Sequence, residues 1–125
     1  MRQKEIRDRC PEYFWVVERG LVGWEPFTQL QPWFFIRDDK MFDATEVWPS
    51  GREESPLIAF ARRQDCDDIA CFDFTAGNNL KVVLIEGWSG GGNAYNVIGE
   101  YPTFWEWLKS AIDDVADWSA LSGEG

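Results

Sequence analysis

The chain contains no histidine, and this absence excludes more reaction chemistry than any motif in the sequence suggests. Without imidazole there can be no Ser-His-Asp triad, no Cys-His dyad and no mixed Cys/His zinc site. Three cysteines, at positions 10, 66 and 71, are too few for a four-thiolate site, and their odd number favours reduced thiols over a disulfide framework. Any enzyme chemistry would have to use carboxylates, a lysine or a tyrosine.

Long hydrophobic runs are also missing. No segment approaches the roughly 20 apolar residues that a membrane span requires, and the first ten residues lack the apolar stretch of a signal peptide. We therefore expect no membrane association and a cytoplasmic location. A chain of 125 residues predicts a single domain, 1–125, which would bury about 68 % of its unfolded surface. Whether the basic first ten residues are ordered stays open at this point.

Positive charge is scarce, with 12 Lys and Arg against 22 Asp and Glu. After Lys81 the chain has seven acidic residues and a single base, Lys109. Direct nucleic-acid binding is disfavoured, because neutralisation of phosphates supplies most of that affinity. A basic protein partner is the better electrostatic match.

The residue pattern predicts a helix, then an antiparallel sheet. Residues 11–19 read as a short helix with a proline in its first turn and Gly20 as its stop. WFFI after Pro32 predicts a strand, and residues 45–48 fit either one helical turn or a loop. LIAFA, IACFDF and KVVLIEGW predict three further strands, with another near residues 94–98. Their short connections require an antiparallel meander, since parallel neighbours need long crossovers.

The last element is a helix that begins with a capping box, Thr103 followed three residues later by Glu106. Its predicted apolar face consists of Phe104, Trp107, Leu108, Ala111, Ile112, Val115 and Trp118. Its other face carries Glu106, Ser110, Asp113, Asp114 and Asp117. The three aspartates oppose the helix dipole by about 0.3–1 kcal/mol each, so stability alone would not select them. Together these elements predict an antiparallel meander with this last helix packed on the sheet.

Several of these segments carry a family resemblance. LIAFARRQDCDDIACFDF, KVVLIEGW and YPTFWEWLKSAIDD resemble the SUKH superfamily, the cell-wall-assembly-regulator-like domains. CPEYFWVVERGLVGW is similar to the N-terminal helix of that family, which ends in glycine. The resemblance covers about Pro11 to Trp118, although the segment before Pro11 is shorter than the family's first helix and residues 27–55 carry no family motif. The resemblance implies an α+β fold, an antiparallel sheet of four or more strands with N-terminal and C-terminal helices packed on it. It also implies either a bacterial immunity protein that binds and neutralises a cognate toxin or a regulatory interaction module, and it implies no catalytic residue.

The acidic turn after the first long strand invites a metal or catalytic interpretation. Asp65, Asp67 and Asp68 could hold Mg²⁺ or act as a phosphatase nucleophile. However, Ile69 stands where a calcium loop needs a ligand and where a phosphatase needs a small hydroxyl or valine side chain. We favour a hairpin turn whose aspartates accept hydrogen bonds from backbone N–H groups. Binding of a partner by these carboxylates ranks second, ahead of a metal or catalytic site. GWSGGGN at 87–93 lacks the Lys-Ser/Thr of a phosphate loop and predicts a flexible connection.

Eight tryptophans are many for this length, and most must lie in the core. Trp105 falls off the apolar helix face, while Trp24 and Trp88 stand beside glycines, so these three are the candidates for contact with a partner. The predicted partner-binding residues are Asp65, Asp67, Asp68, Trp24, Trp88, Trp105, Glu106, Asp113, Asp114 and Asp117.

Three functions compete for these residues. We expect a non-enzymatic immunity protein without metal or cofactor, whose partner is a basic and nuclease-like toxin domain. The alternatives are a regulatory or scaffold module that binds a cellular protein or glycan, and a carboxylate-based, metal-dependent hydrolase.

Overall fold

The chain folds as a six-stranded antiparallel sheet with helices packed on it, which confirms the predicted α+β class. The structure is a computed structural model and describes residues 2–20, 32–48, 56–64, 66–74, 80–86 and 95–121. Its helices are α1 (Arg2–Arg9), α2 (Pro11–Glu18), the 3₁₀ helix η1 (Asp38–Lys40), α3 (Ala44–Val47) and α4 (Phe104–Leu121). Its strands are β1 (Trp33–Phe35), β2 (Phe42–Asp43), β3 (Leu57–Arg63), β4 (Asp68–Asp73), β5 (Lys81–Glu86) and β6 (Asn96–Tyr101). None of the described helices is long and apolar enough to span a bilayer.

The strands follow the order β1-β3-β4-β5-β6, and β2 also pairs with β3. From β3 to β6 they form the antiparallel meander that their short connections predict. Several strand boundaries differ from the prediction, among them those of β3 and β6. β3 extends as far as Arg63, so the acidic turn that follows is shorter. β6 ends at Tyr101 rather than at residue 98, because β5 begins at Lys81 and its first residues pair with Glu100 and Tyr101.

The N-terminal segment forms two consecutive helices, and the basic first residues belong to α1. Ile6 of α1 is fully buried in the core, and the backbone N–H of Cys10 donates to its carbonyl at 2.7 Å. α2 begins at Pro11, as predicted, because proline lacks the N–H that a first helical turn leaves unpaired. The chain leaves α2 through Gly20, whose φ of +68° is the left-handed conformation that glycine adopts without strain. Of the two alternatives predicted for residues 45–48, the helical turn is correct: α3 spans Ala44–Val47, and Trp48 follows it.

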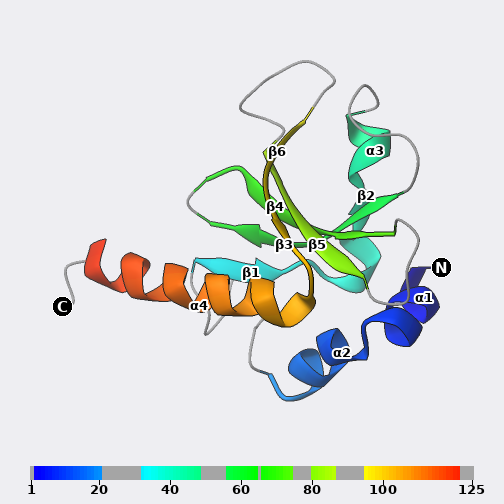
Figure 1. The fold of residues 1–125 in the computed structure, drawn as a ribbon, viewed down its shortest axis with the longest axis horizontal. Helices are drawn as coiled ribbons and strands as arrows, with labels where there is room; N and C mark the ends of the chain where they lie inside the picture. Colours follow the sequence, from blue (N-terminus) through cyan, green and yellow to red (C-terminus); the bar gives the residue numbers. More distant parts are fainter. Residues whose placement is uncertain are drawn as a thin grey trace.

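One face of the sheet is covered by α1, α2 and α4 (Figure 1). The centre of this layer is Phe60 of β3, which stacks on Phe72 of β4 with 4.0 Å between ring centroids. Rings from two helices contact Phe60: Tyr13 of α2 at 5.8 Å, and Phe104 and Trp107 of α4 at 5.9 and 5.1 Å. Such ring pairs add about 0.5–1.5 kcal/mol each beyond the burial of their surface. Phe60 therefore joins both helices to the sheet.

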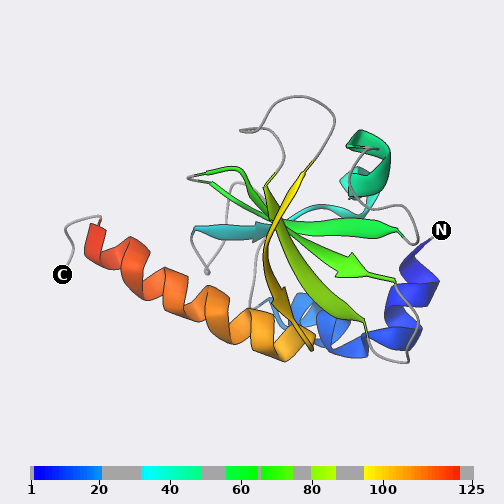
Figure 2. The ribbon, with the colours of Figure 1, turned by 45° about the horizontal axis from the view of Figure 1, so that its top comes forward.

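The opposite face holds a second buried cluster, and α3 lies on that side (Figure 2). Trp48, just after α3, and Tyr95 pack there with 6.4 Å between ring centroids. Asp43 fixes α3 in place, because its Oδ1 accepts hydrogen bonds from the backbone N–H of Thr45 at 3.0 Å and of Leu57 at 3.2 Å. The carboxylate thus caps a helix and ties it to β3.

A β-bulge in β3 changes which residues face which layer. Between Ala59 and Ala61 the strand gains one residue relative to β4, so Phe60 and Ala61 both face the helix layer. After the bulge the alternation is shifted, and Arg62 lies on the face of α3 while Arg63 lies on the face of α4. Two consecutive arginines are therefore directed to opposite sides of the sheet.

The three cysteines differ in exposure, since Cys10 and Cys71 are buried and Cys66 is exposed. Burial, with a smaller contribution from the negative charge of Glu12, raises the pKa of the Cys10 thiol to about 12. Burial together with the charges of Asp43 and Asp73 raises the pKa of Cys71 as well. Buried protonated thiols are poor nucleophiles, so the exposed cysteine should react first.

We expect iodoacetamide to alkylate only Cys66 in the folded protein at pH 8, and all three cysteines in denaturant. Mass spectrometry of the intact chain counts the modified thiols. Cys66→Ser should show no modification in the folded state. Rapid alkylation of two or more thiols without denaturant would contradict the burial of Cys10 and Cys71.

Stability should decrease at alkaline pH. The pKa of Cys10 rises from its usual 9.0 to about 12 on folding, so between these values the unfolded chain loses a proton that the folded chain keeps. The free energy of unfolding should therefore fall above about pH 9, by up to about 1.4 kcal/mol per pH unit for this thiol. Urea unfolding followed by circular dichroism measures the slope, which should be shallower in Cys10→Ala; equal slopes in the two proteins would argue against a raised pKa.

Candidate functional site

The outer face of α4 carries the predicted acidic residues, and the start of the helix determines which residues these are. Thr103 precedes the first turn, and its Oγ1 accepts a hydrogen bond from the backbone N–H of Glu106 at 3.1 Å. Buried side chains on the sheet side fix the rotation of the helix; they are Phe104, Trp107, Leu108 and Ala111. The capping residue and these four residues of the core face are as the sequence predicts.

Glu106, Asp113 and Asp117 form an exposed line of carboxylates along this face, which we name the carboxylate surface. At 1.5 Å per residue the line is about 16 Å long. Trp105, on its flank, leaves 41 % of its surface exposed. The only base among these turns is Lys109, whose Nζ lies 3.6 Å from Glu106. Both views show the last turns of α4 extending away from the sheet (Figures 1 and 2). The carboxylate surface is therefore accessible to a large partner.

Asp114 has a different environment from its neighbour Asp113. Its Oδ2 accepts a hydrogen bond from the indole N–H of Trp33 at 2.8 Å and lies 3.4 Å from the Arg63 guanidinium. Arg63 in turn lies over the Trp33 ring, 5.8 Å from its centroid. Asp114 thus ties the second half of α4 to β1 and β3. A negative charge near the end of a helix interacts unfavourably with the helix dipole. At Asp114 these contacts offset that energetic cost.

Two further residues of the predicted helix faces have unexpected positions. Ile112, assigned to the apolar face, is 53 % exposed, so that assignment is wrong. The apolar side of the helix is narrower than its sequence suggests, because Ala111 and Asp114 are the residues of this turn that meet the layer below and Ile112 lies to one side of them. Ser110, assigned to the acidic face, instead shares a hydrogen bond with the hydroxyl of Tyr101 at 3.1 Å.

The acidic turn between β3 and β4 is far from the carboxylate surface in the sequence. Asp67 and Asp68 are half-buried, and Asp68 starts β4 opposite Glu86 of β5. Asp65 lies outside the described residues. Within the described ranges, no group of three or more Asp, Glu, Cys or His side chains is gathered where it could hold a metal ion.

Of the three tryptophans singled out from the sequence, Trp105 is exposed, and Trp24 and Trp88 lie outside the described residues. Sequence reasoning missed Trp15 of α2, which is 50 % exposed. Its helical spacing carries the signal: Tyr13, Phe14 and Val16 face the core, and Trp15 falls on the other side. Large exposed aromatic rings are common at protein interfaces.

Comparison of the chain with protein-family models, with curated proteins and with solved structures finds no match in any of the three.

The two adjacent aspartates of α4 provide a matched test of this geometry. Asp114→Asn should destabilise the protein by about 1–2 kcal/mol, because it removes the charge that faces Arg63 and weakens the bond from Trp33. Asp113→Asn should change the free energy of unfolding by less than about 0.5 kcal/mol, since its side chain is exposed. Urea unfolding followed by circular dichroism measures both. Equal effects of the two substitutions would refute the structural role of Asp114.

Proposed function

We propose that this protein is a SUKH-type immunity protein, which binds and neutralises a cognate basic toxin domain without catalysing a reaction. The fold supports this proposal, since the resemblance implies an antiparallel sheet with N-terminal and C-terminal helices packed on it. The family's characteristic segments supply the central elements of that fold: β3 and β4, β5, and the start of α4.

The observation that carries the proposal is the carboxylate surface. Glu106, Asp113 and Asp117 are exposed on one rigid helix, with the Trp105 ring beside them. An exposed carboxylate late in a helix costs stability, and among the described residues no ion pair offsets that cost at Asp113 or Asp117. Binding of a positively charged partner would compensate for this arrangement.

The partner that fits best is an enzyme with a cationic substrate site, such as a nuclease or another enzyme that modifies nucleic acids. In such a complex the carboxylates of α4 would occupy positions that nucleic-acid phosphates otherwise take, and the helix would block access to the site. Trp105 supplies the large flat contact typical of residues that dominate binding energy. The net charge of −10 would add long-range attraction to a basic partner.

Co-expression with candidate toxin domains tests the proposal, with rescue of growth and co-purification as readouts. For a toxin that is neutralised, Asp113→Lys combined with Asp117→Lys should slow association by about tenfold or more, because electrostatic steering is reversed at the interface. Asp8→Lys combined with Glu18→Lys makes the same change in net charge on the exposed sides of α1 and α2 and should have a much smaller effect. Association rates by stopped-flow at several salt concentrations measure the difference.

Two outcomes would count against the proposal. If both charge-reversed variants associate at the wild-type rate, α4 is not the docking face. If no basic toxin domain is neutralised and the gene stands without a toxin gene beside it, the regulatory or scaffold alternative is favoured.

A further inference from the structure

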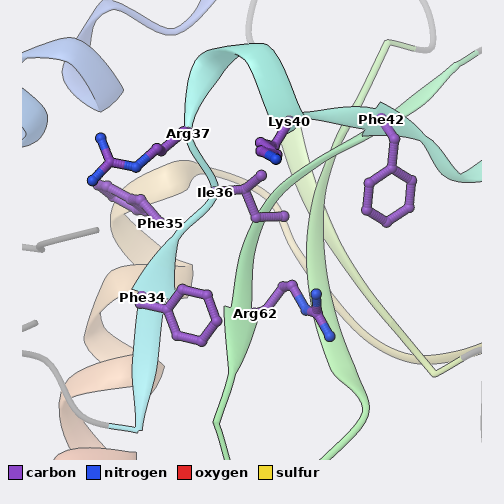
Figure 3. Close-up of a pocket in the computed structure, with 7 residues that line it drawn as sticks. All are labelled: Phe34, Phe35, Ile36, Arg37, Lys40, Phe42 and Arg62. Atoms are coloured by element: carbon purple, nitrogen blue, oxygen red, sulfur yellow. The ribbon is translucent and has the colours of Figure 1, made fainter. Parts of the chain in front are cut away.

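A pocket of about 330 Å³ opens where the edge of the sheet is interrupted between β1 and β2. Its lining residues come from β1, the connection to η1, η1 itself, β2 and β3; they are Phe34, Phe35, Ile36, Arg37, Lys40, Phe42 and Arg62 (Figure 3). The volume lies at the lower end of the range for small-molecule sites, roughly 300–1,000 Å³. Nothing in the sequence pattern predicts this pocket, because two separate edge strands and the bulge of β3 create it together.

The backbone around the pocket is held by hydrogen bonds. β1 and β2 both pair with β3, and between them the chain departs from β3 to form η1. The carbonyl of Arg37 accepts from the N–H of Lys40 at 2.8 Å and of Met41 at 3.1 Å, which closes this turn. The N–H of Ile36 donates to the carbonyl of Phe60 at 2.8 Å. The pocket is therefore built on a preformed frame.

The bulge in β3 directs Arg62 to this pocket. Arg62 is the register partner of Phe34, and both lie on the face of the sheet opposite α4. The next residue, Arg63, lies on the other face and is paired with Asp114. Of two consecutive arginines, one stabilises the fold and the other lines a pocket.

The charge of the pocket contrasts with that of the whole protein. Three of the 12 basic residues line it, Arg37, Lys40 and Arg62, and no acidic residue does so among the described residues. The net charge of the chain is −10. At physiological salt, charges more than about 8 Å away are largely screened, so the lining cations act on a bound ligand more strongly than the distant carboxylates of α4 do.

The side chains divide into a cationic part and an apolar part. Figure 3 shows Lys40, Phe42 and Arg62 around the space into which Phe34 and Ile36 point, while Arg37 extends to the other side of β1. A guanidinium offers two parallel N–H donors to the oxygens of a carboxylate or phosphate, and an ammonium adds a point charge. Phenylalanine rings offer flat apolar surface to another ring.

We propose that this pocket binds a small organic anion, a carboxylate or phosphate group carried on a flat ring. The oxyanion would bond to Arg62 and Lys40, and the ring would pack against Phe34, Ile36 and Phe42. This site lies on the face opposite α4, so it does not depend on the carboxylate surface or on the toxin partner.

Titration of the ¹⁵N-labelled full chain with phenyl phosphate, followed by amide NMR shifts, tests the proposal. We expect shifts at residues 34–42 and 61–63, and a Kd about tenfold or more below those of inorganic phosphate and of benzyl alcohol. Benzoate and adenosine monophosphate distinguish a carboxylate from a nucleotide as the preferred form; tighter binding of either supports the site. Equal affinity for inorganic phosphate and phenyl phosphate, or shifts confined to other elements, would overturn it.

Substitution of the two exposed cations that line the pocket is a second test of the proposal. Arg62→Gln and Lys40→Gln should each weaken phenyl phosphate binding by about tenfold, because each removes a charged hydrogen-bond donor. The matched controls Arg19→Gln and Lys4→Gln, on exposed positions of the helical layer, should bind as the wild type does. Circular dichroism confirms that each variant is folded. Wild-type affinity in Arg62→Gln would mean that these cations serve only to protect the sheet edge, and would overturn the proposal.

Discussion

The packing of Phe60 is the contact on which the rest of the architecture depends. This ring stacks on Phe72 within the sheet and contacts Tyr13 of α2 and Trp107 of α4. Residues from three distant parts of the sequence therefore meet at one side chain. Because interiors are packed as densely as organic crystals, the rotation of α4 about its axis follows from how its aromatic residues fit around Phe60. The side of α4 that faces outward is thus a consequence of the core.

The aspartates of α4 have two different roles, since one of them stabilises the fold and the others place negative charge at the surface. Asp114 lies on the side of α4 that meets Trp33 and Arg63, and its charge is used inside the molecule. Asp113 and Asp117 lie on the outer side, where their charges face solvent. Arg62 and Lys40 of the pocket lie on the opposite side of the sheet. The carboxylate surface and these two cations are thereby separated by the sheet, so that a basic partner and a small anion would not compete for the same side.

The sequence predicted those features that depend on neighbouring residues. Thr103 as cap, Gly20 as stop, and the meander of β3 to β6 all follow from short-range patterns, and the structure confirms them. What could not be predicted depends on contacts between distant residues. The bond between Trp33 and Asp114 joins positions 81 residues apart, and no periodicity distinguishes Asp114 from Asp113. The cationic pocket likewise depends on how two edge strands meet β3.

The bulge of β3 has a consequence for how such a chain can vary over evolution. Substitution at Arg62 or Arg63 would alter one side of the sheet at a time. Deletion of the single extra residue at the bulge would instead exchange the faces of both arginines, separating Asp114 from its ion pair and removing a cation from the pocket. The number of residues between Ala59 and Arg63 therefore determines which face of the sheet each arginine reaches.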